Sequence, residues 1–157
     1  MESIEVKSKK LTWYYNVSYA VGVGGINRSD DVMLVQYLLK KVFENAKYGP
    51  AKPTSNMNVD GFYGPITASY IRAYQRRDQT VNPSASVVMD GRIDKAVSSD
   101  GLSGDISDRV YCIAALNLSL QQDHPSIFAD PSTATDMPGA LKMRMIPIAL
   151  AHEISFD

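Results

Sequence analysis

The segment VDGFYGPITASYIRAYQRR, residues 59–77, limits the possible fold more than any other part of the chain. Its first half has the composition of a tight turn, because glycine permits positive φ and an aspartate side chain accepts hydrogen bonds from nearby backbone N–H groups. Asp60 is the expected acceptor, and Gly61 and Gly64 are the expected positive-φ residues. Pro65 suits the first turn of a helix, where its missing N–H would have no partner. The segment therefore predicts a constrained turn that runs directly into a helix.

The helix that follows this turn is predicted to have one apolar face. Ile71 and Tyr74 are three positions apart and should both face the core. Either Phe62 or Tyr63 should place its ring over the same core. The Thr67 hydroxyl can bond back to the backbone at the start of the helix. Turn and helix thus form a unit whose residues are explained by local structure alone.

Two further helices are predicted from apolar spacing. One lies within INRSDDVMLVQYLLKKVFEN, residues 26–45, with Asn27 or Ser29 as its N-terminal cap. The other runs from about Ile106 to Gln121 and is capped by Asp105. In the first of these helices the predicted core residues are Val32, Val35, Leu38, Leu39, Val42 and Phe43.

Alternating apolar and polar residues predict a strand near each end of the chain. From Leu11 to Val23 every odd position is apolar or aromatic. In residues 140–157 apolar residues alternate with basic ones, and Pro147 marks a bulge or an unpaired edge. We expect the two strands to pair, because neither could bury its apolar face alone.

The remaining segments are predicted loops. Residues 46–58 and 123–139 are polar and interrupted by prolines. Residues 78–104 are expected to be mostly loop, with a short strand at 87–89 and a turn of helix after Ile93. The 157 residues suit one compact unit. Its predicted parts are an N-terminal strand extension (1–25), a helical domain (26–122), and a loop and strand that pack back on that domain (123–157).

The order of helices and turns resembles a known family. LVQYLL, residues 34–39, precedes the Asp-Gly turn described above, and a weaker second Asp-Gly turn follows in MDGRIDKAV, residues 89–97. This pattern resembles the peptidoglycan-binding-like domain, a three-helix module attached to many bacterial and phage cell-wall enzymes. The resemblance covers roughly residues 26–100. The positions that match the family pattern are Val35, Gln36, Leu39, Asp60, Gly61, Gly64, Thr67, Ala73, Tyr74 and Gln75.

The resemblance implies both a fold and a function. The expected fold is mainly α, a three-helix peptidoglycan-binding-like module with a small β element from the N- and C-terminal strands. The expected function is non-catalytic binding of peptidoglycan, the bacterial cell wall. The candidate ligand-binding residues are Asp60, Tyr63, Thr67, Tyr70, Arg72 and Arg76.

Each candidate also has a structural interpretation. Asp60 and Thr67 are what a turn requires, and tyrosines at helical spacing often belong to the core. Arg72 and Arg76, four apart on one helical face, could bind the carboxylates of wall peptides, although such a face is often only solvated surface.

No catalytic, metal-binding or cofactor-binding residue is predicted. Cys112, the only cysteine, lies in the apolar segment RVYCIAALNL and is expected in the core. The two histidines, His124 and His152, lack the spacing of a zinc peptidase. A glycosidase needs two carboxylates, but the sequence cannot single out a pair among 17 acidic residues, so a wall hydrolase remains a third alternative.

The formal net charge of −1 does not favour nucleic acid or an anionic membrane as partner. No segment has the length of a membrane span, and the first residues lack the pattern of a signal peptide. We therefore expect synthesis in the cytoplasm, without membrane insertion. Action at the periplasm or cell wall would then require delivery by another route, such as a phage or a secretion apparatus.

The alternative function is that of a structural or protein-interaction component of such an apparatus. In this interpretation the terminal strands dock on the sheet edge of a protein partner or form a homo-oligomer. The long aromatic strand predicted at residues 11–23 favours this alternative, because a wall-binding module needs no such addition.

Overall fold

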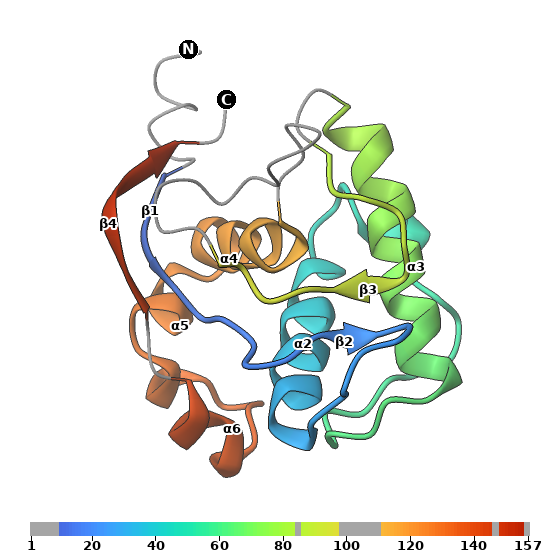
Figure 1. Ribbon diagram of the computed structural model, residues 1–157, viewed down its shortest axis with the longest axis horizontal. Helices are drawn as coiled ribbons and strands as arrows, with labels where there is room; N and C mark the ends of the chain where they lie inside the picture. Colours follow the sequence, from blue (N-terminus) through green and yellow to red (C-terminus); the bar gives the residue numbers. More distant parts are fainter. Residues whose placement is uncertain (1–9, 84–85, 98–110, 146–147, 156–157) are drawn as a thin grey trace.

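The computed structural model describes residues 10–83, 86–97, 111–145 and 148–155 (Figure 1). These residues are mainly helical, with a small antiparallel β element, as the sequence predicts. The helices are α2 (Ser29–Val42), α3 (Pro65–Val81), α4 (Cys112–Asp123), α5 (Pro125–Ala129) and α6 (Gly139–Arg144). The strands are β1 (Lys10–Tyr14), β2 (Val21–Gly22), β3 (Arg92–Ile93) and β4 (Ile148–Ser155).

The predicted pairing of the terminal strands is confirmed. β1 and β4 are antiparallel, with Lys10 opposite Ser155 and Tyr14 opposite Ile148, and the register shifts between Leu11 and Trp13. The pair lies along one side of the molecule in Figure 1, outside α4. A second small sheet joins β2 to β3.

The prediction of one strand over residues 11–23 is wrong, because the chain leaves the sheet after Tyr14. Side chains from distant helices take the backbone N–H groups that a strand partner would have used. Tyr15 N donates to Asn117 Oδ1 (2.7 Å), and Ser18 N donates to Asp31 Oδ1 (2.8 Å). The segment therefore crosses the helices as an irregular strap before it forms β2.

Helix α2 is the centre of the core and has α3 on one side and α4 on the other (Figure 1). All six predicted core positions of this helix are buried. The predicted cap is wrong, since the N-cap residue is Arg28, which makes no side-chain cap bond. Asn27 has positive φ (57°), and its amide instead closes the preceding loop with bonds to Gly22 and Gly25.

Helix α3 starts at Pro65 as predicted and continues to Val81, four residues beyond the predicted end. The added turn is anchored by the buried carboxylate of Asp78. It accepts bonds from Tyr48 Oη (2.8 Å) and from Val87 N (2.9 Å). Residues 87–89 form no strand, which contradicts the prediction, and β3 lies three residues further on. The helical turn predicted after Ile93 is absent from residues 94–97.

The predicted third helix is present as α4, which begins at Cys112 in the described residues. Its buried residues include Ile113, Leu116 and Leu120. The N-cap residue of α4 is Tyr111, whose ψ of 133° is not helical, so the predicted start of this helix is wrong. The predicted cap Asp105 and the predicted first residue Ile106 themselves lie outside the described residues.

The loop predicted over residues 123–139 contains helix α5 and a 3-10 helix, Pro131–Thr133. The loop prediction treated prolines as helix breakers. Pro125 and Pro131 instead occupy first-turn positions, where a missing N–H costs nothing. The short helices pack on the rest of the molecule: the Phe128 ring stacks on Trp13 with centroids 5.4 Å apart.

The last predicted strand is only partly correct. Its first half is helix α6, and its second half is β4. Leu141 and Met145, four residues apart, are buried, whereas Met143 between them is 83% exposed. This burial follows the period of a helix, although the residue types also fit alternation. Pro147 lies outside the described residues.

Candidate functional site

The first Asp-Gly turn is held by one buried side chain, Gln36 of α2. Its Nε2 donates to Asp60 Oδ1 (3.1 Å), to Phe62 O (3.0 Å) and to Thr67 Oγ1 (3.0 Å). Its Oε1 accepts from the N–H groups of Asp60 (3.0 Å) and Gly61 (2.9 Å). The Gln36 side-chain amide thus fixes the turn against α2 through both its N–H donors and its carbonyl acceptor.

The second Asp-Gly turn repeats this arrangement with Gln75 of α3. Gln75 Nε2 is 3.4 Å from Asp90 Oδ1 and donates to Arg92 O (3.0 Å), while its Oε1 accepts from Gly91 N (2.8 Å). In both turns the aspartate Oδ1 accepts the N–H two residues later at 3.0 Å. The glycines have similar positive φ, 82° at Gly61 and 73° at Gly91. Each turn is therefore held by hydrogen bonds to a glutamine on the long helix that precedes the turn in the sequence.

The two glycines of the first turn have different roles. Gly61 has positive φ as predicted, and an added Cβ would clash with Ser29 Oγ and lie 2.9 Å from Ser29 O. Gly64 does not have the predicted positive φ. It is the N-cap residue of α3 with φ −142°, and an added Cβ would meet nothing within 4 Å.

Two of the predicted ligand-binding residues, Thr67 and Tyr70, are buried and make contacts within the protein interior. Thr67 is buried, and its hydroxyl lies 3.3 Å from Phe62 O while it accepts from Gln36. Tyr70 is 2% exposed, packs edge-on against Phe43 and donates its hydroxyl to Ser55 O (2.6 Å). Burial raises the pKa of the Tyr70 phenol above its ordinary value.

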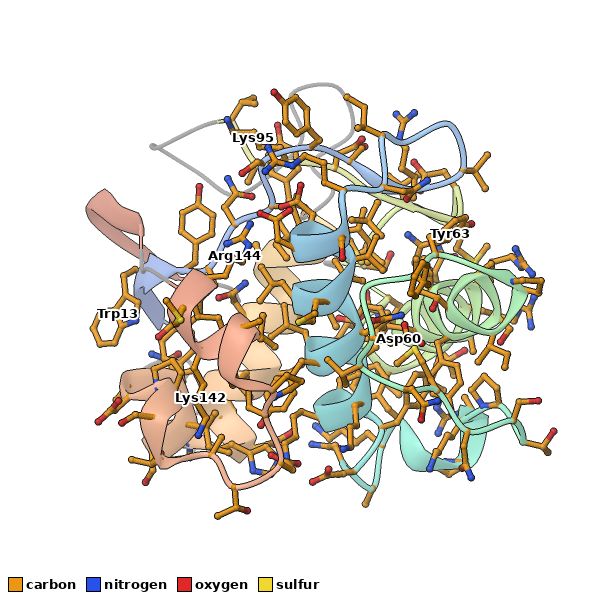
Figure 2. All side chains as sticks on the ribbon, turned by 90° about the horizontal axis from the view of Figure 1, so that it is seen from below. Trp13, Asp60, Tyr63, Lys95, Lys142 and Arg144 are labelled. Atoms are coloured by element: carbon orange, nitrogen blue, oxygen red, sulfur yellow. The ribbon has the colours of Figure 1, made fainter. Side chains whose placement is uncertain are left out.

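The other four predicted residues reach the surface but do not form one cluster. Asp60 is exposed at the turn, and Tyr63 is half-buried beside it (Figure 2). Arg72 and Arg76 are exposed on α3. Arg72 is next to the second turn, since an added Cβ at Gly91 would lie 3.9 Å from Arg72 Cγ.

A cavity of about 210 Å³ opens beside the first turn. Asp60 and Thr67 are the predicted residues that line it. Phe62 stands out at 79% exposure, so Tyr63, not Phe62, is the ring that packs on the core. Sequence reasoning missed the other important lining residues, Asn56, Asn58, Phe62 and Ile66. Residues 56–58 have no apolar periodicity, so the sequence gives no sign that this loop lies beside the turn.

Among the described residues, no group of three or more His, Cys, Asp or Glu side chains could hold a metal ion. Cys112 is buried, as predicted, and burial together with the nearby Asp78 raises the pKa of its thiol, which disfavours the nucleophilic thiolate. The arrangement at the first turn is a preformed surface of amides, a carboxylate and an exposed ring.

Comparison with known proteins returns no relative: no family model matches the chain, and neither a curated protein nor a solved structure matches it. Among the described residues, no helix combines the length and apolarity needed to cross a bilayer.

Proposed function

We propose that this protein is a non-catalytic peptidoglycan-binding protein that acts at the cell wall after delivery by a phage or a secretion apparatus. The support is the pattern of Gln36, Asp60, Gly61 and Thr67, which resembles the peptidoglycan-binding-like domain. These four residues make the contacts that fix the turn. The second turn, fixed by Gln75, repeats the arrangement.

The chemistry of the cavity suits a wall sugar. The Asn56 and Asn58 amides and the Asp60 carboxylate provide donors and acceptors for hydroxyl and acetamido groups. Phe62 and Ile66, 79% and 42% exposed, offer apolar surface to the face of a sugar ring.

The observation that carries the proposal is the exposed Phe62 ring on a turn that Gln36 holds rigidly. Phe62 and Ile66 are both exposed and line the same cavity, so apolar surface is gathered there beside polar groups, as at many binding sites. The turn is fixed before any ligand arrives, so little conformational entropy is lost on binding.

A pulldown on purified sacculi tests the proposal. We expect the wild-type protein to sediment with sacculi at low salt. Phe62→Ala should reduce retention about tenfold, in line with the loss of a stacking contact worth about 1–1.5 kcal/mol. Met143→Ala is the matched control, because Met143 is 83% exposed on α6 and lies outside the cavity. Absence of wild-type retention, or equal loss in both variants, would refute the proposal.

The same pulldown also tests the two predicted arginines, Arg72 and Arg76. Arg72→Ala with Arg76→Ala removes two exposed guanidinium groups from α3. If these groups bind stem-peptide carboxylates, retention should fall about two- to fivefold at low salt and less at high salt, because exposed charge pairs are weak and screened. Unchanged retention would restrict the site to the turn cavity.

One observation favours the second candidate function, a protein-interaction component. Each sheet in the described residues has two strands, so the eight-residue β4 keeps one edge without a strand partner. Such an edge can pair with a strand of another chain. Light scattering after gel filtration distinguishes the candidates: a monomer that binds sacculi supports the wall proposal, whereas an oligomer that ignores them supports the second candidate.

A further inference from the structure

A second cavity, of about 460 Å³, lies between the start of α2 and helix α6. It shares no lining residue with the turn cavity. Its volume is within the range of small-molecule sites in proteins. The lining residues that matter are Arg28, Asp30, Met33, Leu141 and Arg144.

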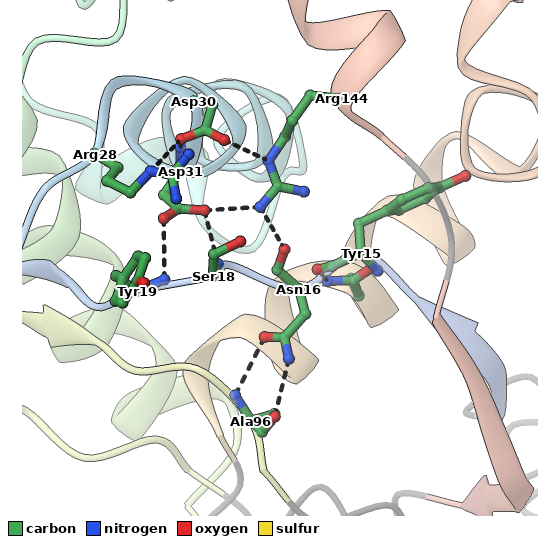
Figure 3. Close-up of polar contacts among 10 residues, drawn as sticks. Tyr15, Asn16, Ser18, Tyr19, Arg28, Asp30, Asp31, Ala96 and Arg144 are labelled. Atoms are coloured by element: carbon green, nitrogen blue, oxygen red, sulfur yellow. Dashed lines mark hydrogen bonds and ion pairs between the residues drawn. The ribbon is translucent and has the colours of Figure 1, made fainter.

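Charges of opposite sign alternate along this cavity. The Asp30 carboxylate stands between two guanidinium groups: Arg28 Nε is 3.4 Å from its Oδ1, and Arg144 Nε is 4.0 Å from its Oδ2 (Figure 3). The side chains of Arg28 and Asp30 are 51% and 39% exposed. Both signs of charge are therefore available to a ligand from solvent.

One side chain that lines the cavity, Arg144, has an unmet hydrogen-bond donor. Arg144 Nη2 donates to Asp31 Oδ1 and to Asn16 O, both at 2.7 Å. Arg144 Nε is buried and has no hydrogen-bond partner among the described residues, since 4.0 Å to Asp30 is beyond hydrogen-bond range. Buried donors without an acceptor are rare in native proteins, so an acceptor supplied by a ligand is a natural complement.

Apart from Ser29, the rest of the lining is apolar. Leu141 is buried, and Met33 is half-buried and packs on the core. A ligand that reaches both the charged and the apolar parts must combine an ammonium, a carboxylate and an aliphatic segment. A simple anion would be repelled by Asp30, and a simple cation by the two arginines.

We propose that this cavity binds a zwitterionic α-amino acid group with an aliphatic stem. The ammonium pairs with Asp30, the carboxylate with Arg28 and the unmet Arg144 donor, and the stem lies on Met33 and Leu141. Two sources carry this chemistry: a free aliphatic amino acid, and the amino acid end group of a peptide side branch. The proposal does not depend on peptidoglycan binding at the turn cavity.

Calorimetric titration with three matched probes tests the charge requirement. The probes are norleucine, N-acetylnorleucine, which lacks the ammonium, and norleucine amide, which lacks the carboxylate. We expect norleucine to bind and each blocked probe to bind at least about tenfold more weakly, as loss of one close charge pair predicts. Equal affinities for all three probes, or no binding of norleucine and of the peptide probe below, would overturn the proposal.

A fourth probe separates the two sources. It is an N-acetylated, C-amidated peptide with diaminopimelate, whose only zwitterion is at the end of the side chain. Tighter binding than norleucine supports a peptide end group as the ligand. Weaker binding supports a free amino acid.

Variants at exposed positions locate the site without loss of folding. Asp30→Asn and Arg28→Gln should each weaken the tighter-binding probe at least about tenfold. Lys52→Gln, which removes an exposed positive charge outside both cavities, is the matched control and should leave the affinity unchanged. Undiminished affinity in Asp30→Asn would overturn the assignment of the cavity. Arg144 is not substituted in this test, because it also binds the buried Asp31.

Discussion

Arg144 Nη2 lies 2.7 Å from Oδ1 of Asp31, a carboxylate with 0% exposure in the first turn of α2 (Figure 3). The same carboxylate accepts from Ser18 N (2.8 Å) and Tyr19 N (3.0 Å). Arg144 also donates to Asn16 O. This one ion pair therefore joins the irregular strap and the central helix to α6, which lies 113 residues further along the chain from Asp31.

Arg144→Met should destabilise the protein by about 3 kcal/mol, because it leaves a buried carboxylate without its counter-charge. Urea unfolding followed by circular dichroism measures the change. Arg76→Met, at an exposed position of α3, is the matched control and should change stability by less than about 0.5 kcal/mol. Similar small losses in both variants would mean that the ion pair does not hold these segments together.

Gln36→Leu and Gln75→Leu should each cost about 1–3 kcal/mol, because each leaves buried turn N–H groups without an acceptor. The two glutamines share no hydrogen-bond partner, so the double variant should cost the sum of the two within about 0.5 kcal/mol. Thermal unfolding of the three variants checks this. Strong non-additivity would show that the turns are one coupled unit.

Gly61→Ala and Gly64→Ala should differ in their effect on the free energy of unfolding. At Gly61 the positive φ and the close approach of Ser29 predict a loss of about 1–3 kcal/mol. At Gly64 the open space and extended backbone predict no steric cost, and the lower entropy of the unfolded chain should offset the poorer N-cap preference of alanine to within about 0.5 kcal/mol. Chemical unfolding of both variants measures the difference. A destabilised Gly64→Ala would contradict the backbone geometry at the start of α3.

Asp136 should make stability depend on pH in the acid range. Burial opposes ionisation, but hydrogen bonds from Lys41 (2.6 Å) and Tyr37 (2.8 Å) outweigh it and lower the pKa of Asp136. A lowered carboxyl pKa stabilises the fold above the ordinary value near 4, and this contribution is lost as pH falls through the folded value. Asp136→Asn should therefore cost about 1 kcal/mol at pH 7 and progressively less below pH ~4. Urea unfolding across pH 2–7 measures this, and a constant difference would contradict it.

Local chemistry made parts of the fold predictable. The helical spacing from Val32 to Phe43 identified the buried face of α2, and the Asp60–Gly61 pair identified the turn. Pairing of the terminal strands followed from their need to bury apolar surface. These features depend on residues close in sequence or on a general requirement of sheets.

Contacts between distant residues explain most of what the sequence did not predict. The strand expected to Val23 ends at Tyr14, because Asn117 and Asp31 bind its backbone, and nothing near the strand indicates those partners. Leu141 and Met145 fit both a strand and a helix until burial distinguishes them. The cavity was missed for the same reason, since Asn58 and Phe62 line one cavity beside a turn that the distant Gln36 fixes.

A titration of ¹⁵N-labelled protein with soluble muropeptides, followed by amide chemical shifts, shows directly whether the first turn binds wall glycan. If the first turn binds wall glycan, the amides of Asn56, Asn58, Gly61, Phe62 and Ile66 should shift together and saturate, and those of α5, which lines neither cavity, should not. Shifts that avoid the turn, or no shifts at millimolar muropeptide, would contradict the central claim.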